Sequence, residues 1–257
     1  MVSRQPAPKV IKVADLDAFI FDLDGVMTET ATVHGAAWKG MFDDYLLERA
    51  AREGETFRPF DIRQDYLQYV DGKPRYDGVR DFLASRGIEL PAGDVDDPPE
   101  RETVAGLGNR KNERFKEHLE MHGVDAFTSS VEFVRQLLAH GLKAALISAS
   151  KNCRPVLKAA GIAGLFEVVV DGVDSARLGL AGKPAPDIFL EAARNLGADA
   201  TRTAIVEDAV SGVAAGARGH FALVIGVDRT GNAEALRASG AHLVVADLAE
   251  LTLEGSG

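Results

Sequence analysis

Short apolar runs that each end in a polar or acidic residue constrain the fold of this chain more than any other feature. Ala- and Leu-rich stretches with helical spacing, such as residues 129–141 and 185–197, separate most of these runs. Alternating strands and helices are typical of a parallel sheet whose two faces are both covered by helices. The sequence therefore predicts an α/β fold. The runs are AFIFDLDG, LKAALISAS, FEVVVDG, TAIVEDA, FALVIGVD and HLVVADL.

Residues 35 to about 125 interrupt this alternation. The segments 38–54, 60–70, 79–88 and 112–123 have the spacing of amphipathic helices, and strand-like runs are scarce. We therefore expect a helical cap domain at 35–125, inserted after the first strand. The core domain would then comprise residues 1–34 and 126–257.

Charge and composition exclude several classes of partner. The net charge is −10 and the isoelectric point is about 5.1, which argues against nucleic acid or an anionic membrane as the main partner. The single cysteine, Cys153, cannot form a disulfide within the chain, and we expect it to be a buried filler. No apolar run resembles a signal peptide or a membrane span, so we expect a cytoplasmic protein. We expect the first ten residues and the final LEGSG to be loose.

Ligands of open parallel sheets bind at the carboxyl ends of the strands, so the functional residues should be the last ones of each run. Two of these runs end in a pair of acids. Buried carboxylates that share a face are costly unless they are paired or bound to a metal such as Mg²⁺. The residues at the ends of the runs are Asp22, Asp24, Ser148, Asp171, Glu207 and Asp208.

Each of these residues also has a simpler explanation. Asp22 or Asp24 could cap the turn before Gly25, and Asp208 could cap the following helix. Ser148 stands where strand–helix junctions often have serine. A loop lysine such as Lys183 is usually solvated, although the prolines around it stiffen the loop and could hold its ammonium near a phosphate. The roles of Asp171 and Asp174 stay open.

The ordered set DLDGV, SAS, GKPAPDIF and ED resembles the haloacid dehalogenase superfamily. The resemblance covers roughly residues 15–34 and 126–250 and implies a Rossmann-like core that carries a cap. It implies that Asp22 is the nucleophile and Asp24 the general acid/base, and that Ser148 and Lys183 bind the phosphoryl group. An aspartate at the position of Asp24 is typical of the phosphoryl-transfer members. The implied Mg²⁺ ligands are Asp22, Asp24, Glu207 and Asp208.

Residues outside these motifs are similar to those of the β-phosphoglucomutase subgroup. His34 stands at the subgroup's spacing after the aspartate pair, Lys111 precedes Asn112 as in its cap helix, and SASKN matches its loop. Arg75 in DGKPR corresponds to an arginine that binds the distal phosphate, with Lys73 and Arg80 as competing candidates. Trp38 is assigned to the substrate site, with a place in the cap core as the alternative. The implied substrate-binding residues are His34, Trp38, Arg75, Lys111, Ser150, Lys151 and Asn152.

The resemblance implies a function as well. Asp22 would carry a phosphoryl group, and the cap would close over β-glucose 1-phosphate. β-Glucose 1,6-bisphosphate would form next, followed by glucose 6-phosphate. The alternative is an Mg²⁺-dependent sugar-phosphate phosphatase. A non-catalytic binding module would be expected to lack at least one of the core motif residues, and none is missing. We expect a phosphorylated hexose as the partner and a monomer as the oligomeric state.

Overall fold

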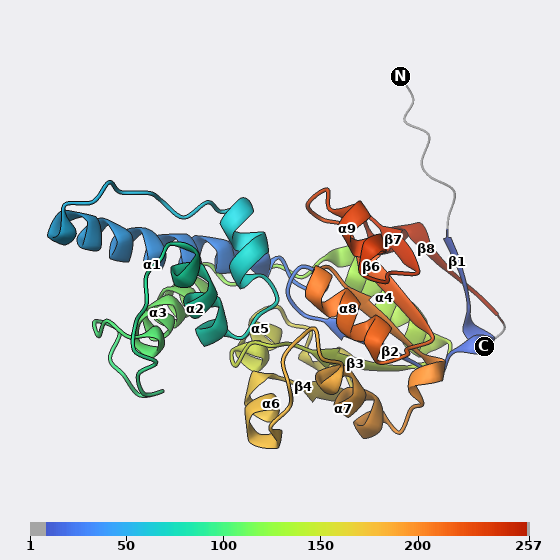
Figure 1. Ribbon diagram of the computed structural model, residues 1–257. Coiled ribbons are helices and arrows are strands. Elements are labelled where there is room, and N and C mark those ends of the chain that lie inside the picture. Colours follow the sequence, from blue (N-terminus) through green and yellow to red (C-terminus); the bar gives the residue numbers. More distant parts are fainter. Residues whose placement is uncertain (1–8, 256–257) are drawn as a thin grey trace. The chain divides into compact units, whose positions relative to one another are not determined.

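The computed structural model describes residues 9–255, and it divides the chain into two compact units (Figure 1). The core unit contains the residues up to Glu29 and those from Asp125 onward, and the helical unit is Thr30–Val124. The helical unit begins before residue 35, where the sequence suggested a boundary, because helix α1 already starts at Thr30. His34 therefore belongs to the helical unit. Each unit is described separately below.

The strands of the core unit form a parallel six-stranded sheet in the order β4-β3-β2-β5-β6-β7. Each of the apolar runs contributes one strand, so the α/β prediction is confirmed. The order places β2 at the centre, between β3 and β5. The strands are β2 (Ala18–Asp22), β3 (Lys143–Ile147), β4 (Val168–Val170), β5 (Thr203–Glu207), β6 (Leu223–Val227) and β7 (Leu243–Val245).

Alternate residues of β2 pack on opposite faces of this sheet. Ala18 and Ile20 are buried in a cluster with residues of α7, α8 and α9. Phe19 and Phe21 contact Phe133 of α4 edge to face. Helices therefore cover both faces. They are α4 (Thr128–Ala139), α5 (Cys153–Ala159), α6 (Gly172–Leu178), α7 (Asp187–Leu196), α8 (Val210–Arg218) and α9 (Ala233–Ala238).

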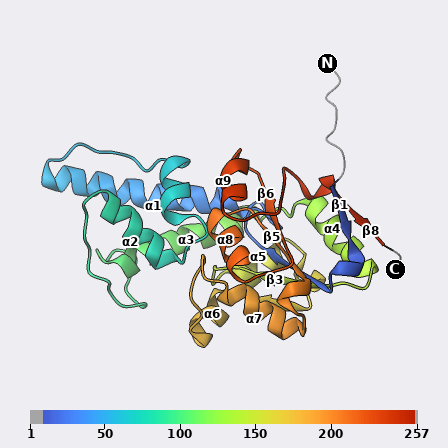
Figure 2. The ribbon, with the colours of Figure 1, turned by 45° about the vertical axis from the view of Figure 1, so that its right-hand side comes forward.

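A second, two-stranded parallel sheet joins β1 (Lys9–Lys12) to β8 (Leu251–Glu254). The two strands run side by side in Figure 1 and Figure 2. The expectation of loose ends was wrong for residues 9–10 and 253–254, which pair in this sheet, with Ile11 and Leu251 buried beside them. The rest of the expected N-terminal tail, residues 1–8, and residues 256–257 lie outside the described residues.

The helical unit packs around an aromatic core of its own. Phe42, Phe60 and Phe82 are buried with ring centroids 4.2–5.2 Å apart. The helix expected at 60–70 begins only at Gln64 and continues as a π-helical turn over Tyr66–Val70, and the Asp61 side chain accepts the backbone N–H groups of Arg63 and Gln64 at its start, as helix caps do. The α-helices of this unit are α1 (Thr30–Glu53), α2 (Arg75–Ser85) and α3 (Val104–His122).

The sequence predicts no membrane span. Within residues 9–255, no helix combines the length and the apolar character needed to cross a membrane.

Neighbouring residues of α7 provide a test of this packing. Phe189 is fully buried, whereas Leu190 is 41% exposed. We expect Phe189→Ala to lower the free energy of unfolding by about 3–5 kcal/mol, because it leaves a cavity beneath the sheet. Leu190→Ala should cost about 1 kcal/mol or less. Chemical denaturation of both variants measures the difference, and similar losses would contradict the assignment of this helix face.

Candidate active site

The site begins where three neighbouring strands end. Asp22 is the last residue of β2, Ser148 follows β3, and Glu207 is the last residue of β5. Since β2 lies between β3 and β5, with Asp22 opposite Ile147 and Phe21 opposite Val206, these polar side chains emerge at one edge of the sheet. All three are buried. The predicted gathering of strand-end residues at this edge is confirmed.

Lys183 lies between two of these carboxylates. Its Nζ donates to Oδ1 of Asp22 at 2.6 Å and also contacts Oε1 of Glu207. The side chain is 3% exposed, and its ammonium lies 5.5 Å from the ring centroid of Phe189. The solvated alternative for Lys183 is therefore wrong. A buried ammonium with two carboxylate partners is well placed to balance charge at the site.

The charges at this edge perturb one another. Burial, the largest effect, raises the pKa of Asp22 well above its usual range, and Glu207 and Asp24 raise it further while Lys183 opposes them. Burial lowers the pKa of Lys183, but Asp22 and Glu207 outweigh it, so the net shift is upward. Asp208 lies close to both acids as well, so three carboxyl groups stand against one ammonium, and a further positive charge would be stabilised here.

Two glycines make room for these acids. A Cβ on Gly25 would lie 1.8 Å from Oδ2 of Asp208, and a Cβ on Gly212 would lie 1.8 Å from Oε1 of Glu207. Gly25 also has a φ of +80°, which disfavours other residues. A side chain at either position would therefore have to displace the neighbouring carboxylate. This role of the two glycines was not predicted, although each lies one to four residues after a pair of acids in the sequence.

Asp22, Glu207 and Asp208 each offer a carboxylate oxygen, and these oxygens lie within 4.8 Å of one another. Oxygen ligands of this kind suit a hard cation such as Mg²⁺, so the residues fit the implied metal. Among the described residues, this carboxylate group does not include Asp24, which was expected to be a fourth ligand. Oδ2 of Asp24 instead lies 3.4 Å from the Ser148 hydroxyl, which donates to it. A role for Asp24 as a metal ligand stays a prediction.

The loop after β3 is organised by its own serines. The Ser148 hydroxyl oxygen accepts the backbone N–H of Ser150 at 3.0 Å, and the Ser150 hydroxyl oxygen accepts that of Asn152 at 3.1 Å. Such turns hold backbone N–H groups in a fixed arrangement. Lys151 is exposed between them. Cys153 follows and is fully buried, and burial raises the pKa of its thiol, as expected of a filler.

The helical unit contains a second buried lysine. Lys111 is 4% exposed, and its Nζ lies 2.5 Å from Nδ1 of His34 and about 5 Å from the ring centroids of Trp38 and Phe115. The His34 ring stacks on Phe115 at 4.2 Å. The structure thus brings three predicted residues together. Phe115 was missed, although its position four residues after Lys111 places it on the same helix face.

Trp38 has the contacts of a core residue. It is 4% exposed and stacks on Phe42 with ring centroids 5.3 Å apart. Its indole also faces Gly78, where a Cβ would lie 3.4 Å from the ring. A contact between Trp38 and a substrate stays a prediction.

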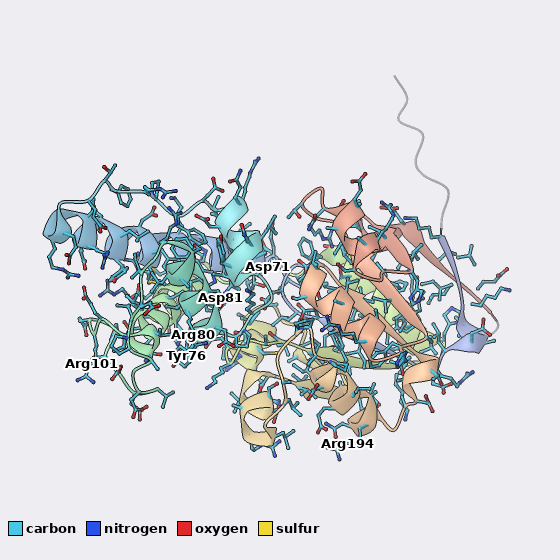
Figure 3. All side chains as sticks on the ribbon, in the orientation of Figure 1. Asp71, Tyr76, Arg80, Asp81, Arg101 and Arg194 are labelled. Carbon is cyan, nitrogen blue, oxygen red and sulfur yellow. The ribbon has the colours of Figure 1, made fainter. Side chains whose placement is uncertain are left out.

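The candidates for a distal phosphate ligand differ in their partners. Lys73 forms an ion pair with Asp81, and Arg80 forms one with Asp77 on the surface of α2. Arg80, Asp81 and Tyr76 are labelled in Figure 3. Within residues 9–255, the hydrogen bonds of Arg75 are long, 3.3 Å to Tyr76 and 3.4 Å to Asn109, and its Nε is buried with no hydrogen-bond partner. These contacts favour Arg75 over the other two, because its guanidinium retains donors for a phosphate.

A pair of glycines with nearly equal φ tests the arrangement at Gly25. Gly25→Ala should weaken Mg²⁺ binding strongly, since its Cβ would displace Asp208. Gly231, at φ +81°, has no atom within 4 Å of its would-be Cβ. Gly231→Ala is therefore the control for backbone strain, which should cost each variant about 1–2 kcal/mol. Calorimetric Mg²⁺ titrations measure the effect, and equal affinities in the two variants would argue against a metal site at Asp208.

Comparisons with known proteins identify the family. Residues 16–220 match a family model of hydrolases, the haloacid dehalogenase-like hydrolases. The chain is 52% identical to a β-phosphoglucomutase of Mycobacterium bovis, covering 91% of this chain and 90% of that protein, and 30% identical to one of Bacillus subtilis, covering 93% of each. The crystal structure of β-phosphoglucomutase from Clostridium difficile superimposes with a TM-score of 0.70 at 27% identity, covering 92% of this chain and 93% of that one. The chain therefore belongs to the haloacid dehalogenase-like hydrolase family and is similar to β-phosphoglucomutases within it.

Proposed function

We propose that this protein is an Mg²⁺-dependent phosphotransferase that converts β-D-glucose 1-phosphate to glucose 6-phosphate through β-glucose 1,6-bisphosphate. The observation that carries the proposal is the buried carboxylate of Asp22, held by Lys183 at 2.6 Å at the carboxyl end of the central strand. A carboxylate fixed in this way can act as a nucleophile toward phosphorus. The partner is a phosphorylated hexose, and the proposed setting is the cytoplasm, with the protein acting as a monomer.

Each residue of the core unit has a distinct role in the proposal. Asp22 attacks phosphorus and becomes an aspartyl phosphate, while Lys183 and Ser148 bind the phosphoryl oxygens. Asp24 donates a proton to the leaving oxygen and later removes one from the acceptor hydroxyl. Its position beside the Ser148 hydroxyl keeps it near the transferred group.

The carboxylates of Asp22, Glu207 and Asp208 would hold Mg²⁺, with Asp24 as the further ligand suggested by the resemblance. Bound Mg²⁺ supplies charge that offsets the repulsion between the nucleophile and the phosphate. The three carboxylates each offer an oxygen within 4.8 Å of the others, which supports this role.

The helical unit favours a mutase over a phosphatase. A mutase must recognise a sugar phosphate at both ends, because the same molecule presents its two ends in turn. The buried pair of Lys111 and His34 offers polar groups for such recognition. The guanidinium of Arg75 offers more, because its buried Nε has no hydrogen-bond partner among the described residues. An enzyme that hands phosphoryl groups to water has less need of them. Exclusion of water protects the aspartyl phosphate, and we assign that task to the helical unit.

The product assay tests the proposal directly. The protein is incubated with Mg²⁺ and β-glucose 1-phosphate, with and without a trace of glucose 1,6-bisphosphate, and glucose 6-phosphate and free phosphate are followed together. We expect glucose 6-phosphate with little free phosphate, formed faster with the bisphosphate. The Asp22→Asn variant should form neither product. Steady release of free phosphate alone would establish the phosphatase alternative, and full activity of Asp22→Asn would refute the nucleophile assignment.

Two arginines of α2 test the distal phosphate contact. Arg75→Ala should raise the KM for the sugar phosphate by about 10- to 100-fold, because it removes charge-assisted hydrogen bonds. Arg80→Ala is the matched control, since Arg80 is exposed and paired with Asp77. Steady-state kinetics give both values. A larger KM change in Arg80→Ala than in Arg75→Ala would reverse the assignment.

A further inference from the structure

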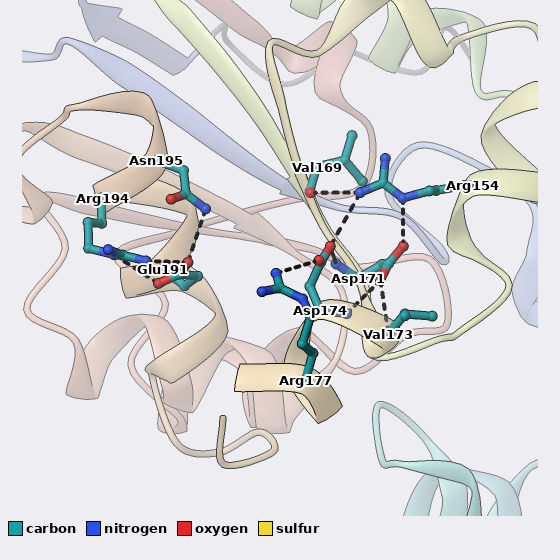
Figure 4. Close-up of polar contacts among 9 residues, drawn as sticks. All are labelled: Arg154, Val169, Asp171, Val173, Asp174, Arg177, Glu191, Arg194 and Asn195. Carbon is teal, nitrogen blue, oxygen red and sulfur yellow. Dashed lines mark hydrogen bonds and ion pairs between the residues drawn. The ribbon is translucent and has the colours of Figure 1, made fainter. Parts of the chain in front are cut away.

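Asp171 is a buried acid that the proposed mechanism does not use. It follows β4, the neighbour of β3, and is 1% exposed. Its Oδ1 accepts the backbone N–H groups of Val173 and Asp174 at 2.8 and 3.0 Å, which caps α6. Its Oδ2 accepts a hydrogen bond from Nε of Arg154 at 3.0 Å (Figure 4). The two oxygens therefore serve different elements, one the helix that follows Asp171 and the other the helix that follows the Ser148 loop.

Arg154 connects that acid to the loop. It is the second residue of α5, directly after the stretch Ser148–Cys153, and its guanidinium also reaches the Val169 carbonyl and Asp174 at 3.4 and 3.3 Å. Figure 4 shows the arginine lying across the end of β4. Although 61% of the arginine side chain is exposed, its Asp171 partner is 2% exposed, so this ion pair is shielded on one side. It fixes the first turn of α5 relative to β4.

Gly172, the residue after Asp171, also contacts the Ser148–Asn152 loop. The Gly172 N–H donates to the Ser150 carbonyl at 3.2 Å. A Cβ on Gly172 would lie 2.4 Å from the Ala149 carbonyl oxygen and 2.9 Å from the Lys151 nitrogen. The start of α6 therefore packs directly against the backbone of the loop, with no space between them.

We propose that Asp171 is a positioning residue which, through Arg154 and Gly172, fixes the loop Ser148–Asn152 in the geometry that binds the transferred phosphoryl group. The inference rests on the proposed function, in which Ser148 binds that group. The helix cap at Oδ1 is the structural role of Asp171, and the Arg154 contact at Oδ2 is its positioning role. Because the two roles use different oxygens, substitution can separate them.

Two variants remove the positioning contact from opposite sides. Asp171→Asn keeps an acceptor oxygen for the α6 cap but replaces the oxygen that faces Arg154 with an NH₂ group, and Arg154→Met removes the guanidinium. Arg177→Met is the matched control, because Arg177 is 65% exposed and pairs with Asp174 on the same helix without contacting Asp171. Gly172→Ala is a further variant, which pushes on the loop while leaving both carboxylate contacts in place.

Loop order is measured first, without any substrate, by hydrogen exchange of the Ser150 and Asn152 amides. The inhibition constant of orthovanadate, a mimic of the transferred phosphoryl group, is measured second on the active enzyme. This constant is a property of the active molecules alone, so a partly unfolded preparation does not shift it. Melting temperatures report any loss of overall stability.

We expect Asp171→Asn, Arg154→Met and Gly172→Ala each to speed exchange of the loop amides and to raise the vanadate inhibition constant about tenfold, because small misplacements of a positioning group are costly. The Asp171→Asn/Arg154→Met double variant should be no worse than the worse single variant, since both remove one interaction. Arg177→Met should match the unmodified protein.

Unchanged loop exchange and an unchanged inhibition constant in Asp171→Asn and Arg154→Met would overturn the proposal, and a lower melting temperature alone would leave Asp171 as a helix cap only. Failure of the proposed function looks different. In that case the unmodified protein neither turns over sugar phosphates nor binds vanadate, and the exchange measurement alone decides whether Asp171 orders the loop.

Discussion

The ammonium of Lys183, buried between the carboxylates of Asp22 and Glu207, is the interaction on which the rest of the core depends. It joins the central strand β2, the end of β5 and the loop before α7. Removing one partner of a buried pair costs about 3–5 kcal/mol, because the other charge is left uncompensated. Asp208 lies close by as well, so the site holds three acids and one ammonium, an excess of acidic groups. That excess suits a divalent cation, which links the packing of the core to its chemistry.

The helical unit also contains a buried lysine, Lys111, with different partners. Lys111 is buried beside a histidine and two aromatic rings, those of His34, Trp38 and Phe115. Aromatic faces attract a desolvated ammonium through their quadrupoles, which favours its burial at this place. Each unit thus has a buried lysine, Lys183 beside the proposed nucleophile Asp22 and Lys111 among the proposed substrate-recognition residues.

The sheet and the core motifs could be predicted because their signals are local. An apolar run that ends in an acid indicates both a buried strand and its functional end, and all six runs became strands. The pairing of β1 with β8 could not be predicted, since it joins the two ends of the chain and neither KVIK nor LTLE is strongly apolar. The helix expected at 60–70 starts only at Gln64, because Asp61 caps its first turn from outside. The contacts of Asp171 with Arg154 depend on packing between β4 and α5, which spacing along the sequence does not reveal.

The central claim is that Asp22 carries the phosphoryl group. The most direct test is to mix the protein with β-glucose 1,6-bisphosphate and Mg²⁺, quench the mixture in acid within the first turnovers, and locate any phosphorylated residue by peptide mass spectrometry. The account predicts a phosphoryl group on Asp22 that hydroxylamine removes, as expected of an acyl phosphate, and none in Asp22→Asn. A phosphoryl group on another residue, such as Ser148, or an adduct that survives in Asp22→Asn, would contradict it.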